Sequence, residues 1–135
     1  MSSFLALFVE VNLGFQKLNK KFERECGLSI VQWRCLSHVV RRPAASAQTI
    51  ADSLGVHPST LTQSLKRLRK RGQILVETDP ADSRKKIISI TREGNRALRD
   101  FEGRTQALFE RNGPEKDALK AIQAFLGRFP TDLRA

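Results

Sequence analysis

Cysteine is scarce in this sequence, which has only Cys26 and Cys35 among its 135 residues. Two cysteines are too few for a disulfide scaffold or a cysteine-based zinc site, so we expect both to be buried and structural. Polar residues interrupt every apolar run well before the ~18 residues that a membrane span needs. The start, Met1-Ser2-Ser3, lacks the basic n-region and the small-residue cleavage site of a signal peptide. We therefore expect a cytoplasmic protein without membrane contact.

Motifs for catalysis and cofactor binding are also missing. The sequence has no glycine-rich phosphate loop, no cluster of metal ligands and no plausible serine, histidine and aspartate order, and it contains only two histidines. We therefore expect no enzymatic activity, no cofactor and no metal site.

Acidic residues are in short supply, since 14 Asp and Glu face 24 Lys and Arg for a formal charge of +10. Between His57 and Arg92, nine basic residues oppose three acidic ones, so this stretch carries +6 of the +10. A solvated basic face would account for such a run. However, like charges at i and i+4, such as Lys66 and Lys70, cost about 0.2–0.5 kcal/mol, which an anionic ligand would offset. The charge therefore favours nucleic acid as the partner.

Helix signals dominate the first half of the sequence. Apolar residues from Phe4 to Phe22 fall in alternating steps of four and three, which predicts one long helix that Gly27 ends. Capping serines, a first-turn proline and terminal Pro or Gly residues mark three shorter helices at Ser29 to Pro43, Ser46 to Gly55 and Pro58 to Gly72. The last two predict a helix-turn-helix whose second helix can lie in the major groove of DNA.

The period of the apolar pattern changes after the fourth predicted helix. β-rich runs at Gln73–Thr78 and Lys85–Ile90, joined by turn residues 79–84, predict a hairpin that serves as a wing. Thr91 can cap the next helix, and a last helix is expected after Gly113-Pro114. The predicted fold class is mainly α with a small β-hairpin, a winged helix-turn-helix flanked by terminal helices.

The predicted recognition helix points its leucines inward and leaves polar side chains outside. Gln63 can bond bidentately to adenine, and small hydroxyls near the helix start allow close approach to phosphates and base edges. Simple capping is an equally good interpretation of Ser59 or Thr60 taken alone. The candidate DNA-binding residues on the helix and wing are Ser59, Thr60, Thr62, Gln63, Lys66, Arg67, Asp82, Arg84, Lys85 and Lys86.

The apolar seam of the first helix spans roughly 28 Å and has no small domain of its own to cover it. The C-terminal helices are equally rich in Phe and Leu, so we expect burial against a second copy, with packing inside one chain as the alternative. The candidate dimer-interface residues are Phe4, Phe8, Val11, Phe15, Leu119, Ile122, Phe125 and Phe129. The chain is expected to form one 1–135 unit, with a DNA-binding lobe at 28–92 and helical dimerisation segments at 1–27 and 93–135.

An ordered set of motifs between residues 60 and 94 resembles the MarR family of bacterial transcription regulators. The motifs are Thr60-Leu61, Leu68, Gly72-Gln73-Ile74, Asp82-Ser83-Arg84 and Thr91-Arg92-Glu93-Gly94. The resemblance implies a homodimer whose two lobes reach successive major grooves of a pseudo-palindromic operator in double-stranded DNA. Arg84 would enter the minor groove while Asp82 holds its guanidinium. Gln63 stands where many members have arginine, which puts the operator sequence in doubt but not the binding mode.

The resemblance also implies regulation, with a repressor released by a small aromatic or phenolic ligand as the leading hypothesis. Such a ligand would bind between the dimer region and the DNA-binding lobe. Trp33, Arg34 and His38 are predicted near that junction, although we expect core packing of Trp33 and a satisfied side chain at His38. Two alternatives stay open, a low-specificity architectural DNA-binding protein and a cysteine-based redox-responsive regulator. The redox branch of the family relies on supporting tyrosines, which this sequence lacks.

Overall fold

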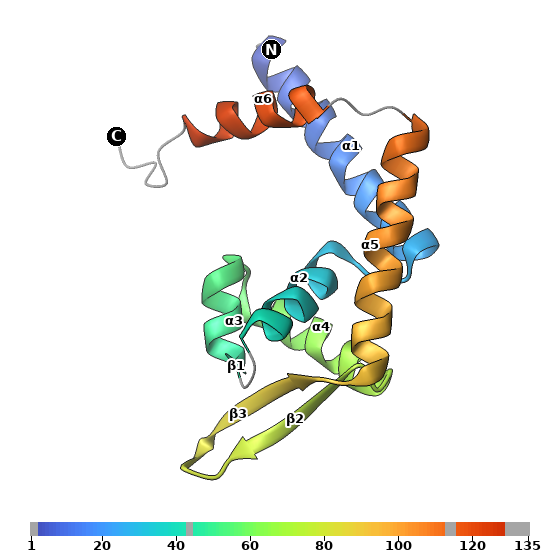
Figure 1. Cartoon of the computed structure of the whole chain (residues 1–135). Helices are drawn as coiled ribbons and strands as arrows, with labels where there is room; N and C mark the ends of the chain where they lie inside the picture. Colours follow the sequence, from blue (N-terminus) through green and yellow to red (C-terminus); the bar gives the residue numbers. More distant parts are fainter. Residues whose placement is uncertain (1–2, 43–44, 113–115, 129–135) are drawn as a thin grey trace, which may run out of the picture.

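The computed structural model describes residues 3–42, 45–112 and 116–128, which form six helices and a small antiparallel sheet (Figure 1). The elements are α1 (Ser3–Cys26), α2 (Ile30–Arg41), β1 (Ala45–Ser46), α3 (Ala47–Leu54), α4 (Pro58–Lys70), β2 (Ile74–Asp79), β3 (Asp82–Ile90), α5 (Arg92–Asn112) and α6 (Lys116–Gly127). None of the helices in these ranges has the length and apolar character that crossing a lipid bilayer requires. The mainly α fold with a β-hairpin is confirmed.

Local hydrogen bonds fix the helix boundaries at the residues that the sequence predicts. At α2, the Ser29 hydroxyl accepts from the Gln32 backbone at 3.1 Å, and the Gln32 side chain accepts from the Ser29 backbone at 3.1 Å. This capping box satisfies two backbone donors that the first turn leaves unpaired. Between α3 and α4, Gly55 has a φ of +63°, a left-handed conformation that closes α3 and turns the chain into α4.

The hairpin is longer than the prediction, and its turn is shorter. β2 pairs with β3 from Ile74 opposite Ile90 to Asp79 opposite Asp82, so the turn is Pro80-Ala81 and not residues 79–84. The apolar pattern misses the start of β3 because those residues are polar, whereas backbone pairing continues regardless of side-chain polarity. β1 also pairs with β3, giving the sheet order β1-β3-β2. A strand of two residues has no periodicity from which to predict it.

One hydrophobic core joins the lobe to the long terminal helices. Leu36 of α2, Ile50 of α3 and Leu68 of α4 are fully buried, and Ile88 of β3 is almost so. The end of α1 reaches this core through Phe22, whose ring meets that of Phe101 on α5 edge to face at 6.4 Å between centroids. The wing, the recognition helix, the end of α1 and α5 are therefore anchored to a single packed body.

Most of α1 and all of α6 lie outside the core, above the lobe and opposite the wing in the view of Figure 1. Phe4 is 81% exposed and Phe8 is 54% exposed, and α6 has no buried residue among those described. The predicted interface residues Val11, Phe15, Leu119 and Phe125 are also exposed, Ile122 is half-buried, and Phe129 lies outside the described residues. Packing within one chain, the alternative considered from the sequence, leaves these side chains of α1 and α6 only partly covered among the described residues. An apolar surface of this extent marks an interaction site.

Candidate nucleic-acid interface

The recognition helix α4 turns one face into the core and one to solvent. Leu61 and Leu68 are buried, whereas Ser59, Thr60, Thr62, Gln63, Lys66 and Arg67 are all exposed. The inward leucines fall seven residues apart, two turns of helix, so the remaining face is free to approach a partner. The structure thus presents the predicted polar residues on one exposed surface.

Hydrogen bonds at the start of α4 show which side chains are bonded within the helix start and which are free to meet a partner. His57 caps the helix, because its Nδ1 accepts from the Ser59 backbone at 3.2 Å, while the two side chains lie 2.7 Å apart. The Thr62 hydroxyl donates to the Pro58 carbonyl at 2.9 Å. Within the described residues, the side chains of Thr60 and Gln63 make no hydrogen bond, so their donors and acceptors face water. The cap is therefore His57 and not Ser59, whose hydroxyl pairs with the His57 ring, and the side chains available for base contact are those of Thr60 and Gln63.

The basic end of α4 is partly tied to α1. Arg67 Nη1 lies 3.4 Å from Glu23 Oε1, and Arg71 Nη1 donates to the Gly27 carbonyl at 3.2 Å. These contacts hold the end of the recognition helix against the long N-terminal helix. Lys66 and Lys70 are exposed, and neither makes an ion pair within the described part of the chain. They are therefore free to contribute to a positive field beside the exposed face.

The wing carries an ordered arginine near its tip. Asp82 Oδ1 accepts from the Arg84 backbone at 3.0 Å and from Arg84 Nε at 3.2 Å, and the Arg84 side chain is 89% exposed. These two bonds from Arg84 hold the pKa of Asp82 below its ordinary value. Lys86 Nζ donates to the Thr78 hydroxyl at 2.9 Å. The wing therefore presents a guanidinium that is restrained at Nε and open at its outer end.

Three exposed or half-buried residues next to the wing were not predicted as candidates. Arg42, Ser46 and Thr49 line a cleft of about 460 Å³ together with Lys85 and Lys86 of β3. Pairing of β1 with β3 brings the start of α3 to the wing, and no sequence pattern predicts that pairing. The signal that was available is the pair of arginines, Arg41 and Arg42, just before the Ser46 cap.

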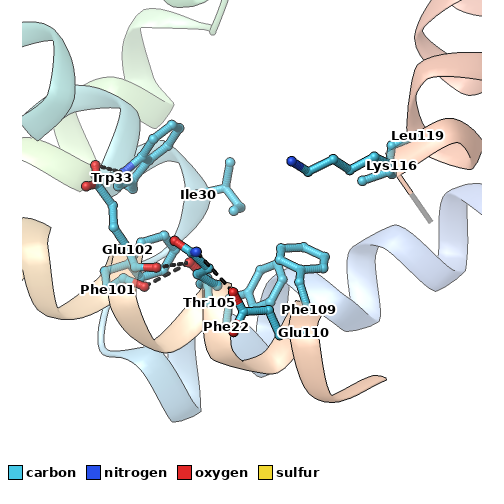
Figure 2. A pocket seen from close by; sticks show the side chains of 11 residues that line it. Phe22, Ile30, Trp33, Phe101, Glu102, Thr105, Phe109, Glu110, Lys116 and Leu119 are labelled. Carbon is cyan, nitrogen blue, oxygen red and sulfur yellow. Dashed lines mark hydrogen bonds between the residues drawn. The ribbon is translucent and has the colours of Figure 1, made fainter. Parts of the chain in front are cut away.

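A second cavity lies between the lobe and the terminal helices. It measures about 680 Å³, and Figure 2 shows the rings of Phe22, Trp33, Phe101 and Phe109 on one side, facing Lys116 and Leu119 of α6. Trp33 stacks on Phe101 at 6.4 Å between centroids, and its Nε1 donates to Glu102 Oε1 at 3.0 Å. The expectation that Trp33 packs against the core is confirmed, and its ring also lines this cavity.

Arg34 and His38 lie elsewhere than the sequence suggests. They line a separate cleft between α2 and α3, not the cavity beside Trp33. The expectation that His38 is satisfied is wrong, because its Nε2 is buried and has no hydrogen-bond partner among the described residues. Burial first, then the charges of Arg42 and Arg34, lower the pKa of His38.

Both cysteines are buried and free, as predicted. Burial raises the pKa of Cys35 to about 12, and burial together with the Glu25 charge raises the pKa of Cys26. Because the thiolate is the reactive form, both sites are poor targets for oxidation. The described residues also contain no group of three His, Cys, Asp or Glu side chains able to hold a metal ion.

The comparison with family models decides the identity of the lobe. The model of the MarR family matches residues 28–86, from the start of α2 into the wing. Over these residues the chain is similar to the MarR family. The resemblance noted in the sequence is thus confirmed, and MarR-family proteins are transcription regulators, a class that does not act by catalysis.

Solved MarR-type structures share the fold over nearly the whole chain. PcaV from Streptomyces coelicolor, in complex with its natural ligand, aligns with a TM-score of 0.72 and 21% identity over 87% of each chain. BpsR from Bordetella bronchiseptica, whose DNA binding is regulated by 6-hydroxynicotinic acid, aligns at 0.68 and 22% over 91% of this chain and 97% of its own. A MepR variant from S. aureus bound to an oligodeoxyribonucleotide aligns at 0.60 and 16% over 95% and 96%. No curated protein matches the chain in sequence.

Proposed function

We propose that this chain is a sequence-specific DNA-binding regulator that acts in the cytoplasm as a homodimer and represses transcription until a small ligand releases it. The observation that carries the DNA-binding part is one exposed, cationic surface formed by α4 and the wing. Thr60 and Gln63 would meet base edges in the major groove, Lys66 would meet phosphates, and Arg84 would enter the minor groove. Asp82 supports that role of Arg84 by limiting its rotamers before DNA arrives.

The other candidate contacts serve the phosphate backbone in this proposal. The side chains are those of Ser59, Thr62, Arg67, Lys85 and Lys86, to which we add Arg42, Ser46 and Thr49 beside the wing. Charges and hydroxyls that meet phosphates fix the register of a protein on the duplex without reading its sequence. Neutralised phosphates also release counterions, so affinity should fall steeply as salt rises.

The homodimer rests on the exposed apolar faces of α1 and α6. A single Phe side chain buries roughly 150–250 Å² at an interface, and burial stabilises by about 25 cal/mol per Å². Phe4, Phe8 and Phe15 therefore offer several kcal/mol to a second copy, on the order of 10 kcal/mol at full burial. A two-fold axis through these helices would present two recognition helices to a pseudo-palindromic operator. The proposal assigns residues 28–92 to DNA binding, and residues 1–27 and 93–135 to dimerisation.

The cavity beside Trp33 is the proposed ligand site. Its aromatic walls suit a small planar aromatic or phenolic molecule, because ring faces and edges stack favourably at this spacing. Glu102 and Glu110 supply acceptors for a hydroxyl or amine of the ligand, and Lys116 supplies a cation. A ligand that joins α2, α5 and α6 here would bias the separation of the two recognition helices in a dimer.

The proposal is tested by selecting bound fragments from the source genome and then measuring affinity by mobility shift. A sequence-specific regulator should prefer its selected operator over random DNA by a factor of about 10³ or more. A preference below about tenfold would instead support a low-specificity architectural protein. Release of the operator complex by a panel of phenols and aromatic acids, but not by peroxides, would support the small-ligand mechanism. Transcription from the selected promoter in vitro distinguishes repression from activation.

Regulation by cysteine oxidation has little support, since both thiols are buried and have raised pKa values. Release of DNA by peroxide, abolished in a variant without cysteines, would restore that alternative.

A further inference from the structure

A cleft between α2 and α3 is lined by a cluster of basic side chains, of which the proposed function uses only Arg42. Arg34, His38 and Arg41 come from α2, Arg42 follows directly as its C-cap, and the hydroxyl-bearing Thr49 and Ser53 come from α3. The cleft measures about 280 Å³, the volume of roughly nine liquid waters at about 30 Å³ each. It therefore has room for a small anion and part of its hydration shell.

The charges in this cleft are unbalanced. No carboxylate lines it, and within the described residues none of the three arginines makes an ion pair or a side-chain hydrogen bond. Arg34, His38 and Arg42 follow one another at intervals of four residues, so the two arginines lie along one side of the helix with the His38 ring between them. The helix dipole favours cations near the end of α2, which accounts for Arg41 and Arg42. It gives no such benefit to Arg34 in the first half of the helix.

His38 adds a second, independent observation. Its Nε2 is buried without a hydrogen-bond partner among the described residues, which is unfavourable for a polar atom. Burial, and after it the charges of Arg42 and Arg34, lower the pKa of His38, which favours the neutral imidazole. The buried Nε2 of His38 therefore lies without a partner beside three guanidinium groups that make no ion pair among the described residues.

We propose that the α2–α3 cleft binds a small metabolite with at least two anionic oxygens, of the phosphate-monoester or polycarboxylate class. The guanidinium groups of Arg34, Arg41 and Arg42 bind its oxygens, the Thr49 and Ser53 hydroxyls donate to it, and the ring of His38 lies beside it. The metabolite would link α2 to α3, the first helix of the helix-turn-helix. The site is separate from the aromatic cavity beside Trp33.

A free anion fits this cleft better than a phosphate of the DNA backbone. Arg42 and Thr49 also line the cleft beside the wing, so a DNA strand could pass close by. However, Arg34, Arg41 and Ser53 line only the α2–α3 cleft and not the cleft beside the wing. If Arg34 and Arg41 contribute to DNA affinity, the cleft contacts the DNA backbone instead, and the experiment must detect that outcome.

The first test measures anion binding to the full chain without DNA, so its outcome does not depend on the proposed regulatory function. Inorganic phosphate and citrate are titrated by calorimetry at constant ionic strength, with acetate as the monovalent control. We expect saturable binding of phosphate or citrate, and the stronger of the two identifies the class. The double variant Arg34→Gln/Arg41→Gln should weaken that binding by at least about tenfold. Arg96→Gln/Arg99→Gln, which removes two charges from α5, should change it by less than about twofold. An equal loss of anion affinity in the two double variants, or acetate binding as tight as that of phosphate and citrate, would show that only diffuse surface charge attracts anions. Either result would overturn the proposal.

The second test follows the histidines by NMR, with His57→Asn, which keeps a capping side chain, used to assign the two signals. The bound anion offsets the charges of Arg34 and Arg42, so the pKa of His38 should rise while that of His57 stays unchanged. An unchanged His38 signal at saturating phosphate and citrate would contradict the site. In phosphate-free buffer, the two double variants should also bind operator DNA equally. A markedly larger loss for Arg34→Gln/Arg41→Gln would assign the cleft to the DNA backbone instead.

Discussion

The junction between the wing and α5 depends on the missing side chain of Gly94. A Cβ atom at this position would overlap the Gln73 carbonyl oxygen and lie 2.7 Å from Ile90 Cγ1. The Gln73 oxygen cannot move away cheaply, because it is backbone and accepts from the Thr91 backbone at 3.1 Å. Gly94 itself donates to the Thr91 hydroxyl at 3.0 Å, the cap that starts α5. The Thr-x-x-Gly pattern thus has a steric origin in close packing of α5 against the start of β2.

The variant Gly94→Ala should therefore lower the free energy of unfolding by about 2–4 kcal/mol. Overpacking against an immobile backbone costs about 1–3 kcal/mol, and a weakened hydrogen bond adds about 0.5–1.5 kcal/mol. Gly103 of the same helix is the matched control, since a Cβ there meets nothing within 4 Å. Gly103→Ala should raise the free energy of unfolding by about 0.5–1 kcal/mol, because alanine is the better helix former.

Urea unfolding followed by circular dichroism measures both variants, at one fixed protomer concentration because dimer stability depends on concentration. The two should differ by about 3–5 kcal/mol, a large part of the stability of an ordinary domain. Equal unfolding midpoints, or a Gly94→Ala variant more stable than the parent chain, would refute the steric account of this junction.

Three further predictions concern the wing, the dimer and the cysteines. Arg84→Ala should weaken operator binding by about 1–3 kcal/mol, roughly 5- to 150-fold. The control Arg96→Ala also removes an exposed, ion-paired arginine and should have little effect. Equal affinities of the two variants in mobility-shift titrations would exclude Arg84 from the interface. Phe15→Asp should give monomers or aggregates in light scattering while Phe15→Leu stays dimeric, and a well-folded Phe15→Asp dimer would contradict the interface. Cys35 has a pKa of about 12, so roughly one Cys35 thiol in ten thousand is ionised at pH 8. Neither Cys35 nor Cys26, whose pKa is also raised, should react with a thiol reagent before the protein is denatured. Rapid labelling of either cysteine in the native protein would reopen the redox mechanism.

Local chemistry made much of this fold readable from the sequence. The Ser29 capping box, the Ser46 cap, the Gly55 turn and the Thr91 cap all form as predicted, because each involves atoms at most a few residues apart. The leucine stripe of α4 likewise identified the exposed face of the recognition helix. These signals, with the spacing of the motifs in residues 60–94, were sufficient for the winged helix-turn-helix and for the MarR resemblance.

Long-range pairing decided what the sequence left open. β1 carries no pattern of its own, and only its register against β3 brings Ser46 and Thr49 beside the wing lysines. Similarly, the sequence suggested that Trp33, Arg34 and His38 share one pocket, but successive side chains on a helix point about 100° apart. Trp33 therefore faces α5, while Arg34 and His38 face α3. Composition and spacing determined which elements form, because those depend on neighbouring residues; tertiary packing determined which side chains meet, because that depends on the direction in which each element is held.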